Sequence, residues 1–114
     1  MARNKSQVLC QFSDLDDLSS KGFKVKLKRK STDIFIVKKD DSVYAYVNNC
    51  PHAHSPLEWN PDEFLDANKE MIICSFHGAK FKIEDGACIS GACDRAPLTA
   101  LQVSVINDQV VLQL

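Results

Sequence analysis

Two short motifs, CPHAH at residues 50–54 and CSFHG at residues 74–78, contain all three histidines of this 114-residue chain. In the first motif one residue separates the cysteine from the next histidine, and in the second motif two residues do. Thiolates and imidazoles are ligands for zinc and for iron–sulfur clusters, whereas magnesium and calcium prefer oxygen ligands. Two such pairs in one chain predict a metal centre that is gripped by two loops.

The order of the ligands distinguishes two kinds of centre. Zinc modules usually pair like with like, as two cysteines followed by two histidines. Here each motif places a cysteine before a histidine, Cys50 with His52 and Cys74 with His77. A Rieske centre uses this set, because two cysteines bind one of its irons and two histidines bind the other. The pattern favours a Rieske centre and leaves a structural zinc site as the alternative.

The bulk composition is that of an ordinary globular domain, with 45% hydrophobic and 25% charged residues. A net charge of −1 gives no general attraction to nucleic acid or to an anionic membrane surface. No apolar run approaches the roughly 20 residues that span a bilayer, and the N-terminal segment has no apolar stretch long enough for a signal peptide. We expect one domain over residues 1–114, cytoplasmic, without nucleic-acid or membrane partners.

Short strands separated by turn signals surround the two motifs. Alternating or β-branched runs predict strands at residues 8–12, 23–27, 33–38, 42–47, 71–73, 79–83, 101–106 and 109–114. The pair 33–38 and 42–47 predicts a hairpin that leads directly into the first motif, and Asn107-Asp108 predicts a tight turn in a closing hairpin. No segment shows a helical period of useful length. The sequence therefore predicts an all-β fold.

The motifs and their flanks resemble the two cluster-binding boxes of Rieske ferredoxins. The resemblance rests on CPHAHSPL, CSFHGAKF, EDGACISG and APL, which begin at residues 50, 74, 84 and 96, and on the preceding VYAYVNN. It covers nearly the whole chain. It implies a Rieske-like antiparallel β-sandwich with a small cluster-binding loop subdomain at about residues 49–80.

The resemblance also implies a cofactor and a role. One [2Fe-2S] cluster per chain is expected, with Cys50 and Cys74 on one iron and His52 and His77 on the other. The protein would be a one-electron carrier that receives electrons from a reductase and passes them to an oxygenase or another redox acceptor. Two alternatives stay open, a cluster-bearing small subunit of a larger reductase of the nitrite reductase kind, and a zinc-stabilised interaction module.

A catalytic site of its own is not expected in this chain. Rieske oxygenases need a second, mononuclear iron bound by two histidines and a carboxylate. Once His52 and His77 bind the cluster, only His54 remains. No G-x-G-x-x-G motif for a dinucleotide is present. We therefore predict an electron-transfer protein rather than an enzyme.

Two features depart from the family pattern. His54 stands where family members usually have glycine; we interpret it as a solvent-facing loop histidine, with tuning of the cluster as the alternative. The 21 residues between His52 and Cys74 form an unusually long connection, and its part at residues 58–70 carries five acidic residues and one lysine. We hypothesise that this acidic segment borders the docking face and attracts a basic partner; a merely solvated loop is the alternative.

The remaining residues of interest concern potential and disulfides. Ala79 and Phe81 replace the hydroxyl residues that donate hydrogen bonds to the cluster in high-potential relatives, so we expect a midpoint potential below zero, in the lower part of the Rieske range. Ser55 and Phe76 stand where those relatives have a disulfide between the boxes. The other cysteines are expected to be small buried side chains rather than a disulfide or redox pair; they are Cys10, Cys88 and Cys93.

Overall fold

The computed structural model describes residues 6–16, 18–27, 30–49, 57, 63–74, 79–90 and 97–113. Its elements are β1 (Ser6–Gln11), the 3-10 helix η1 (Phe12–Asp14), β2 (Ser19–Leu27), β3 (Lys30–Lys39), β4 (Ser42–Val47), β5 (Met71–Ile73), β6 (Lys80–Lys82), β7 (Cys88–Ser90), β8 (Ala100–Leu101), β9 (Val103–Ile106) and β10 (Gln109–Gln113). They form three antiparallel sheets, ordered β1-β10-β9, β2-β3-β4-β8 and β5-β6-β7. The predicted all-β fold is confirmed. Within the described residues, no helix is long and apolar enough to cross a membrane.

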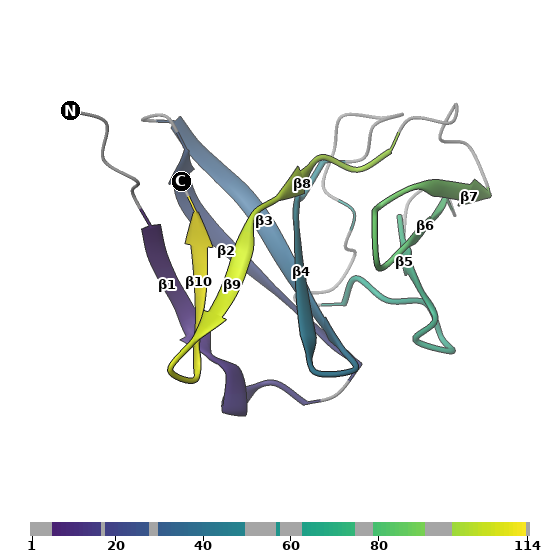
Figure 1. The fold of residues 1–114 in the computed structure, drawn as a ribbon. Coiled ribbons are helices and arrows are strands. Elements are labelled where there is room, and N and C mark those ends of the chain that lie inside the picture. Colours follow the sequence, from purple (N-terminus) through teal and green to yellow (C-terminus); the bar gives the residue numbers. More distant parts are fainter. Residues whose placement is uncertain are drawn as a thin grey trace.

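The sheet of β2, β3 and β4 lies between the other two sheets (Figure 1), and β3 is buried on both faces. Ile34 and Ile36 pack with residues of β10 on one side, whereas Phe35 and Val37 pack with residues of β5 and β6 on the other. All four side chains are fully buried. A strand covered on both faces has a continuous apolar run rather than an alternating one, which explains the sequence IFIV at residues 34–37.

Two tight turns fix the registers of the main hairpins. Asp40 and Asp41 have φ angles of 51° and 63°, and Asn107 and Asp108 have φ angles of 50° and 63°. Two consecutive residues with positive φ form a type I′ turn, whose twist matches that of a two-residue hairpin. Asn and Asp tolerate positive φ well. Both predicted hairpins are therefore confirmed, β3 with β4 and β9 with β10.

The C-terminal part of the chain changes sheets within a segment that was predicted as one strand. Residues 100–101 pair with β4 as β8, and residues 103–106 pair with β10 as β9. The break falls at Gln102, whose carbonyl oxygen accepts a hydrogen bond from the Gln113 N–H at 2.9 Å. The alternating sequence predicts extended backbone here but cannot reveal that its two halves have different partners.

Strand β7 and the state of Cys88 were not predicted. Cys88 is disulfide-bonded, so the expectation that it is an unbonded filler is wrong. Neither Cys10 nor Cys74 is in a disulfide, and the partner of Cys88 therefore lies outside the described residues. Disulfide formation requires two cysteines at a defined separation, which residue types alone do not give.

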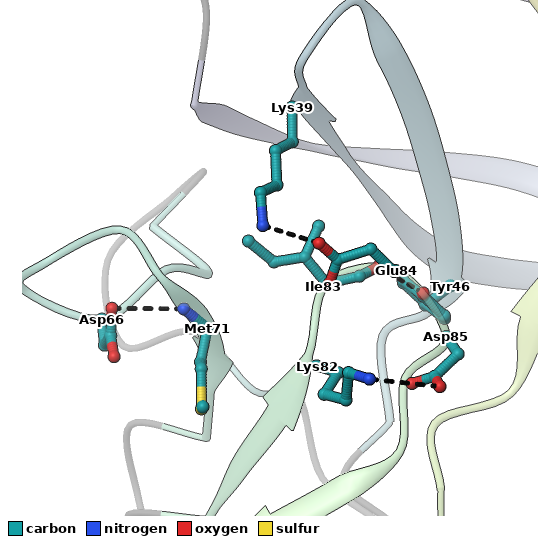
Figure 2. A network of polar contacts seen from close by, with 8 residues as sticks. All are labelled: Lys39, Tyr46, Asp66, Met71, Lys82, Ile83, Glu84 and Asp85. Carbon is teal, nitrogen blue, oxygen red and sulfur yellow. Dashed lines mark hydrogen bonds and ion pairs between the residues drawn. The ribbon is translucent and has the colours of Figure 1, made fainter.

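Polar contacts clamp the turn at residues 83–86 to the middle sheet (Figure 2). The Tyr46 hydroxyl donates a buried hydrogen bond of 2.5 Å to the Ile83 carbonyl oxygen, and Lys39 Nζ donates to Glu84 Oε2 at 2.6 Å. Gly86 has a φ of +73°, and a Cβ added there would lie 2.8 Å from the Tyr46 ring. The close approach of the turn to β4 thus depends on glycine.

Replacing Tyr46 by phenylalanine is expected to lower the free energy of unfolding by about 1–2 kcal/mol, because the buried Ile83 carbonyl loses its donor. Burial raises the pKa of Tyr46, so the hydroxyl remains a donor at ordinary pH. Urea denaturation would measure the change. Tyr44→Phe is the matched control, since this half-buried neighbour has no hydroxyl hydrogen bond within the described residues; equal losses in the two variants would contradict the prediction.

Candidate metal centre

Of the four predicted ligands, Cys74 lies within the described part of the chain, whereas Cys50, His52 and His77 lie outside it, as does His54. Cys74 directly follows β5, and its N–H donates a hydrogen bond of 2.9 Å to the Ala79 carbonyl oxygen. This bond continues the ladder between β5 and β6 by one residue pair, Cys74 with Ala79. The second motif therefore begins at the closed end of a hairpin, which is a rigid support for a ligand.

The surroundings of Cys74 are apolar. Its side chain is fully buried in a core that includes Ala79, Phe81 and Leu57, each fully buried as well. Burial in apolar surroundings disfavours a charged thiolate unless a partner such as a metal stabilises it. Cys74 forms no disulfide, so its sulfur fits the role of a ligand.

The donor chemistry of the two motifs fits a [2Fe-2S] cluster of the Rieske type, and the buried Cys74, which is not in a disulfide, agrees with it. No group of three His, Cys, Asp or Glu side chains within the described residues could hold a metal ion. A complete ligand set would draw on the three predicted ligands outside that part of the chain.

Asn48 supports the first motif from the end of β4. Its N–H donates to the Asp33 carbonyl oxygen at 2.8 Å, and its Oδ1 accepts a hydrogen bond from the Leu57 N–H at 2.8 Å. One residue thus connects β3 with backbone on both sides of Cys50 and His52. Sequence reasoning missed this role, although an asparagine at the end of a strand is a known signal for side-chain to backbone bonding.

Phe64 attaches the long connection to the middle sheet. Its ring stacks on Phe35, with ring centroids 4.3 Å apart and an interplanar angle of 6°. Its N–H donates to Ser20 Oγ at 3.1 Å, and its carbonyl oxygen accepts from the Ile73 N–H at 2.9 Å. Phe64 therefore attaches the connection both to the middle sheet and to β5, the strand that leads into the second motif.

Asp66 is part of the support and not of an exposed acidic rim. Its side chain is only 8% exposed, and it forms an ion pair of 3.4 Å with Lys80. The Glu70 N–H donates to Asp66 Oδ1 at 2.9 Å. The Met71 N–H donates to the same oxygen at 3.4 Å (Figure 2). Burial acts to raise the pKa of Asp66, but the bonds from Glu70, Met71 and Lys80 outweigh it and lower the pKa. Asp66 closes the turn that leads into β5.

Replacing Asp66 by asparagine is expected to lower the free energy of unfolding at neutral pH by about 1–2 kcal/mol, because an ion pair and charge-assisted hydrogen bonds are weakened. A carboxyl whose pKa is lowered by folding stabilises the protein above its unfolded pKa and loses this effect as the pH falls through the folded pKa. Urea denaturation should therefore show a smaller difference at acidic pH. Asp33→Asn, at a half-exposed site, is the control. A difference that does not depend on pH would contradict the assignment.

A profile of the Rieske [2Fe-2S] domain matches residues 5–109 of the chain. Two similar structures are ferredoxins of carbazole 1,9a-dioxygenase. One, in a complex of reduced oxygenase and oxidised ferredoxin, has a TM-score of 0.75 and 22% identity and covers 97% of this chain and 94% of that one. The other, from Nocardioides aromaticivorans IC177, has a TM-score of 0.72 and 22% identity, covering 94% and 95%.

A third similar structure is a putative nitrite reductase NADPH (small subunit) oxidoreductase protein, with a TM-score of 0.66 and 23% identity, covering 95% of this chain and 97% of that one. No curated protein sequence matches the chain. These structural similarities support the fold, while the profile covers nearly all of the sequence, both motifs included. The chain belongs to the Rieske [2Fe-2S] domain family, whose cofactor is a [2Fe-2S] cluster.

Proposed function

We propose that this protein is a Rieske ferredoxin, a one-electron carrier that receives electrons from a reductase and delivers them to an oxygenase. The observation that carries the proposal is the match in size with two ferredoxins, in which at least 94% of each chain is covered. One of those ferredoxins is in a complex with its oxygenase. The resemblance extends beyond the two motifs to the whole of a small carrier protein.

In this proposal Cys50 and Cys74 would hold one iron, and His52 and His77 the other. When bound, the cluster supplies a redox couple that takes up and releases one electron. The contribution of the chain is positioning. Asn48 ties both sides of the first motif to β3, and the bond between Cys74 and Ala79 closes the hairpin that supports the second.

Metal and sulfide analysis of the purified protein tests the proposal. Two irons and two acid-labile sulfides per chain, with the EPR signature of a histidine-ligated cluster, are expected. Titration of the reduced protein with hexacyanoferrate(III) should consume one equivalent per chain. One zinc per chain without sulfide would overturn the proposal in favour of a zinc-stabilised interaction module.

The midpoint potential of the loaded protein is expected to lie below 0 mV, in the lower part of the family range of roughly −150 to +300 mV. Ala79 and Phe81 are fully buried beside Cys74 and carry no hydroxyl to donate to the cluster. Hydrogen bonds to sulfur stabilise the more negative, reduced state, so their absence lowers the potential. Protein-film voltammetry measures it, and Ala79→Ser should shift it upward. A wild-type value above about +100 mV would contradict the prediction.

A second candidate function is a cluster-bearing small subunit of a larger reductase. It is favoured by the similarity to the putative nitrite reductase small subunit, which also covers nearly the whole of both chains. Size-exclusion chromatography of the native protein distinguishes the two candidates. A carrier should elute alone with its iron, whereas a subunit should elute with a catalytic chain in fixed ratio.

A further inference from the structure

The register of β2 with β3 places two lysines on the face of the middle sheet that packs toward Cys74, here called the cluster side. Lys24 pairs with Asp33 and Lys26 with Ser31. Paired residues of antiparallel strands lie on the same face, and alternate residues of one strand share a face. Both lysines therefore lie on the face of Phe35, the face that Phe64 covers.

This lysine pair is close to the support of the first motif. Lys24, Asp33 and Asn48 form one row across the sheet, because Lys24 pairs with Asp33 and the Asn48 N–H donates to the Asp33 carbonyl oxygen. Neighbouring strands lie about 4.8 Å apart, so roughly 10 Å separates the backbones of Lys24 and Asn48. Asn48 in turn holds Leu57, which follows the first motif.

The charge of the pair is exposed and only loosely compensated. The Lys24 side chain is 72% exposed, and its Nζ lies 4.0 Å from Asp33 Oδ1, a contact of little strength at the surface. Lys26 is also exposed, and its cross-strand neighbour Ser31 is neutral. On this face of β2 and β3, Asp33 is the only acidic residue among those described.

The acidic connection offers less negative charge than its sequence suggests. In its described part, the Asp66 side chain is 8% exposed and forms an ion pair with Lys80, and Lys69 lies next to Glu70, whereas Glu63 and Glu70 are exposed. On this face of β2 the charged residues are Lys24 and Lys26, so β2 is the part of this side that presents a basic surface.

We propose that Lys24 and Lys26 form a docking site for an acidic surface of a redox partner protein, which they attract to the cluster side of the molecule. The inference rests on the proposed function and adds the charge of the partner and the residues that meet it. Redox encounters bury little area and depend on complementary charge for rate and orientation, so two exposed lysines near the electron-transfer site are sufficient for this role.

Stopped-flow oxidation of the reduced, cluster-loaded protein tests the charge near the site. Each oxidant takes one electron from the protein: hexacyanoferrate(III) is reduced to hexacyanoferrate(II), and hexaamminecobalt(III) is reduced to cobalt(II). At an ionic strength of about 10 mM the Debye length is about 30 Å, so the lysines act on both ions. The double variant Lys24→Glu with Lys26→Glu should slow the anionic oxidant about fivefold or more and speed up the cationic one.

The matched control is Lys21→Glu with Lys30→Glu. It changes the net charge by the same amount and lies on β2 and the neighbouring β3, but its residues pair with Ile36 and Leu27 on the opposite face. Both lysines are exposed. The control should change either rate less than twofold. Equal effects in the two double variants, or no effect in the first, would overturn the proposal.

A second measurement needs no electron transfer. Hexacyanochromate(III), a paramagnetic anion that is not reduced here, should broaden the backbone amide NMR signals of residues 24–26 and 31–33 in the wild type and not in the Lys24→Glu, Lys26→Glu variant. Broadening without any change in the oxidation rates would show an anion site away from the electron path and overturn the proposal. Binding of a short oligonucleotide with unchanged rates would overturn it in favour of nucleic acid. Absence of iron and sulfide would instead refute the proposed function itself.

Discussion

Replacing Cys74 by alanine is expected to abolish cluster binding. The variant loses one of two predicted thiolate ligands, and the fully buried, apolar site provides no other ligand among the described residues. Iron and acid-labile sulfide should fall to background, and the visible absorption of the cluster should disappear. Because the change removes only a small side chain, the all-β circular dichroism spectrum should persist.

Cys10→Ala is the matched control for this experiment. Like Cys74, Cys10 is not in a disulfide, and it is half-buried in β1, where it packs with a core that includes Val110 of β10. Burial raises the pKa of the Cys10 thiol, with a smaller opposing effect from Lys21, so the neutral form is favoured over a metal-binding thiolate. The control should keep two irons and two sulfides. A Cys74→Ala protein that retains the full cluster would show that Cys74 is not a ligand.

Replacing Phe64 by alanine is expected to cost about 3–5 kcal/mol of unfolding free energy, the usual range for a fully buried phenylalanine. The ring stacks on Phe35 of the middle sheet, and its removal leaves a cavity between that sheet and the connection. The connection leads into β5 and Cys74. We therefore also expect the variant to lose its cluster iron to a chelator at least tenfold faster than the wild type under native conditions.

Leu112→Ala separates the local effect from general destabilisation. Leu112 is fully buried in the core between β10 and β3, on the opposite side from Phe64, and its truncation costs about 2–5 kcal/mol. Chevron plots and chelator kinetics on both variants give stability and release rate together. Release that is equally fast in Leu112→Ala at equal stability would contradict a special role for Phe64.

Much of the β2–β3–β4 sheet and of the β9–β10 hairpin could be predicted, because the sequence patterns that indicate them are local. Alternation at residues 23–27, the apolar run of β3 and the Asp and Asn turns each report on a few neighbouring residues. The contacts that span the chain were not predicted. The split of the last strands at Gln102 depends on which distant edge is free, and the disulfide of Cys88 depends on a separation in space.

In the candidate site, too, the local features could be predicted and the long-range contacts could not. Ligand types and spacing identified the chemistry and the family, and Cys74 is buried and not in a disulfide, as a ligand should be. The supports Asn48 and Phe64 were missed, since their roles lie in bonds to Leu57 and stacking on Phe35. Asp66 was counted as a steering charge because the sequence does not show that Lys80 lies beside it.

Because β3 is buried on both faces, cluster binding on one face should affect the stability of the sheet on the other face. Alternate residues of β3 belong to cores on opposite faces, so loss of the packing on the Cys74 side also removes contacts that hold this strand. Ligand binding to the folded state raises the stability of every element that unfolds with it. We therefore expect loss of the cluster to lower the stability of the distant sheet of β1, β10 and β9 as well.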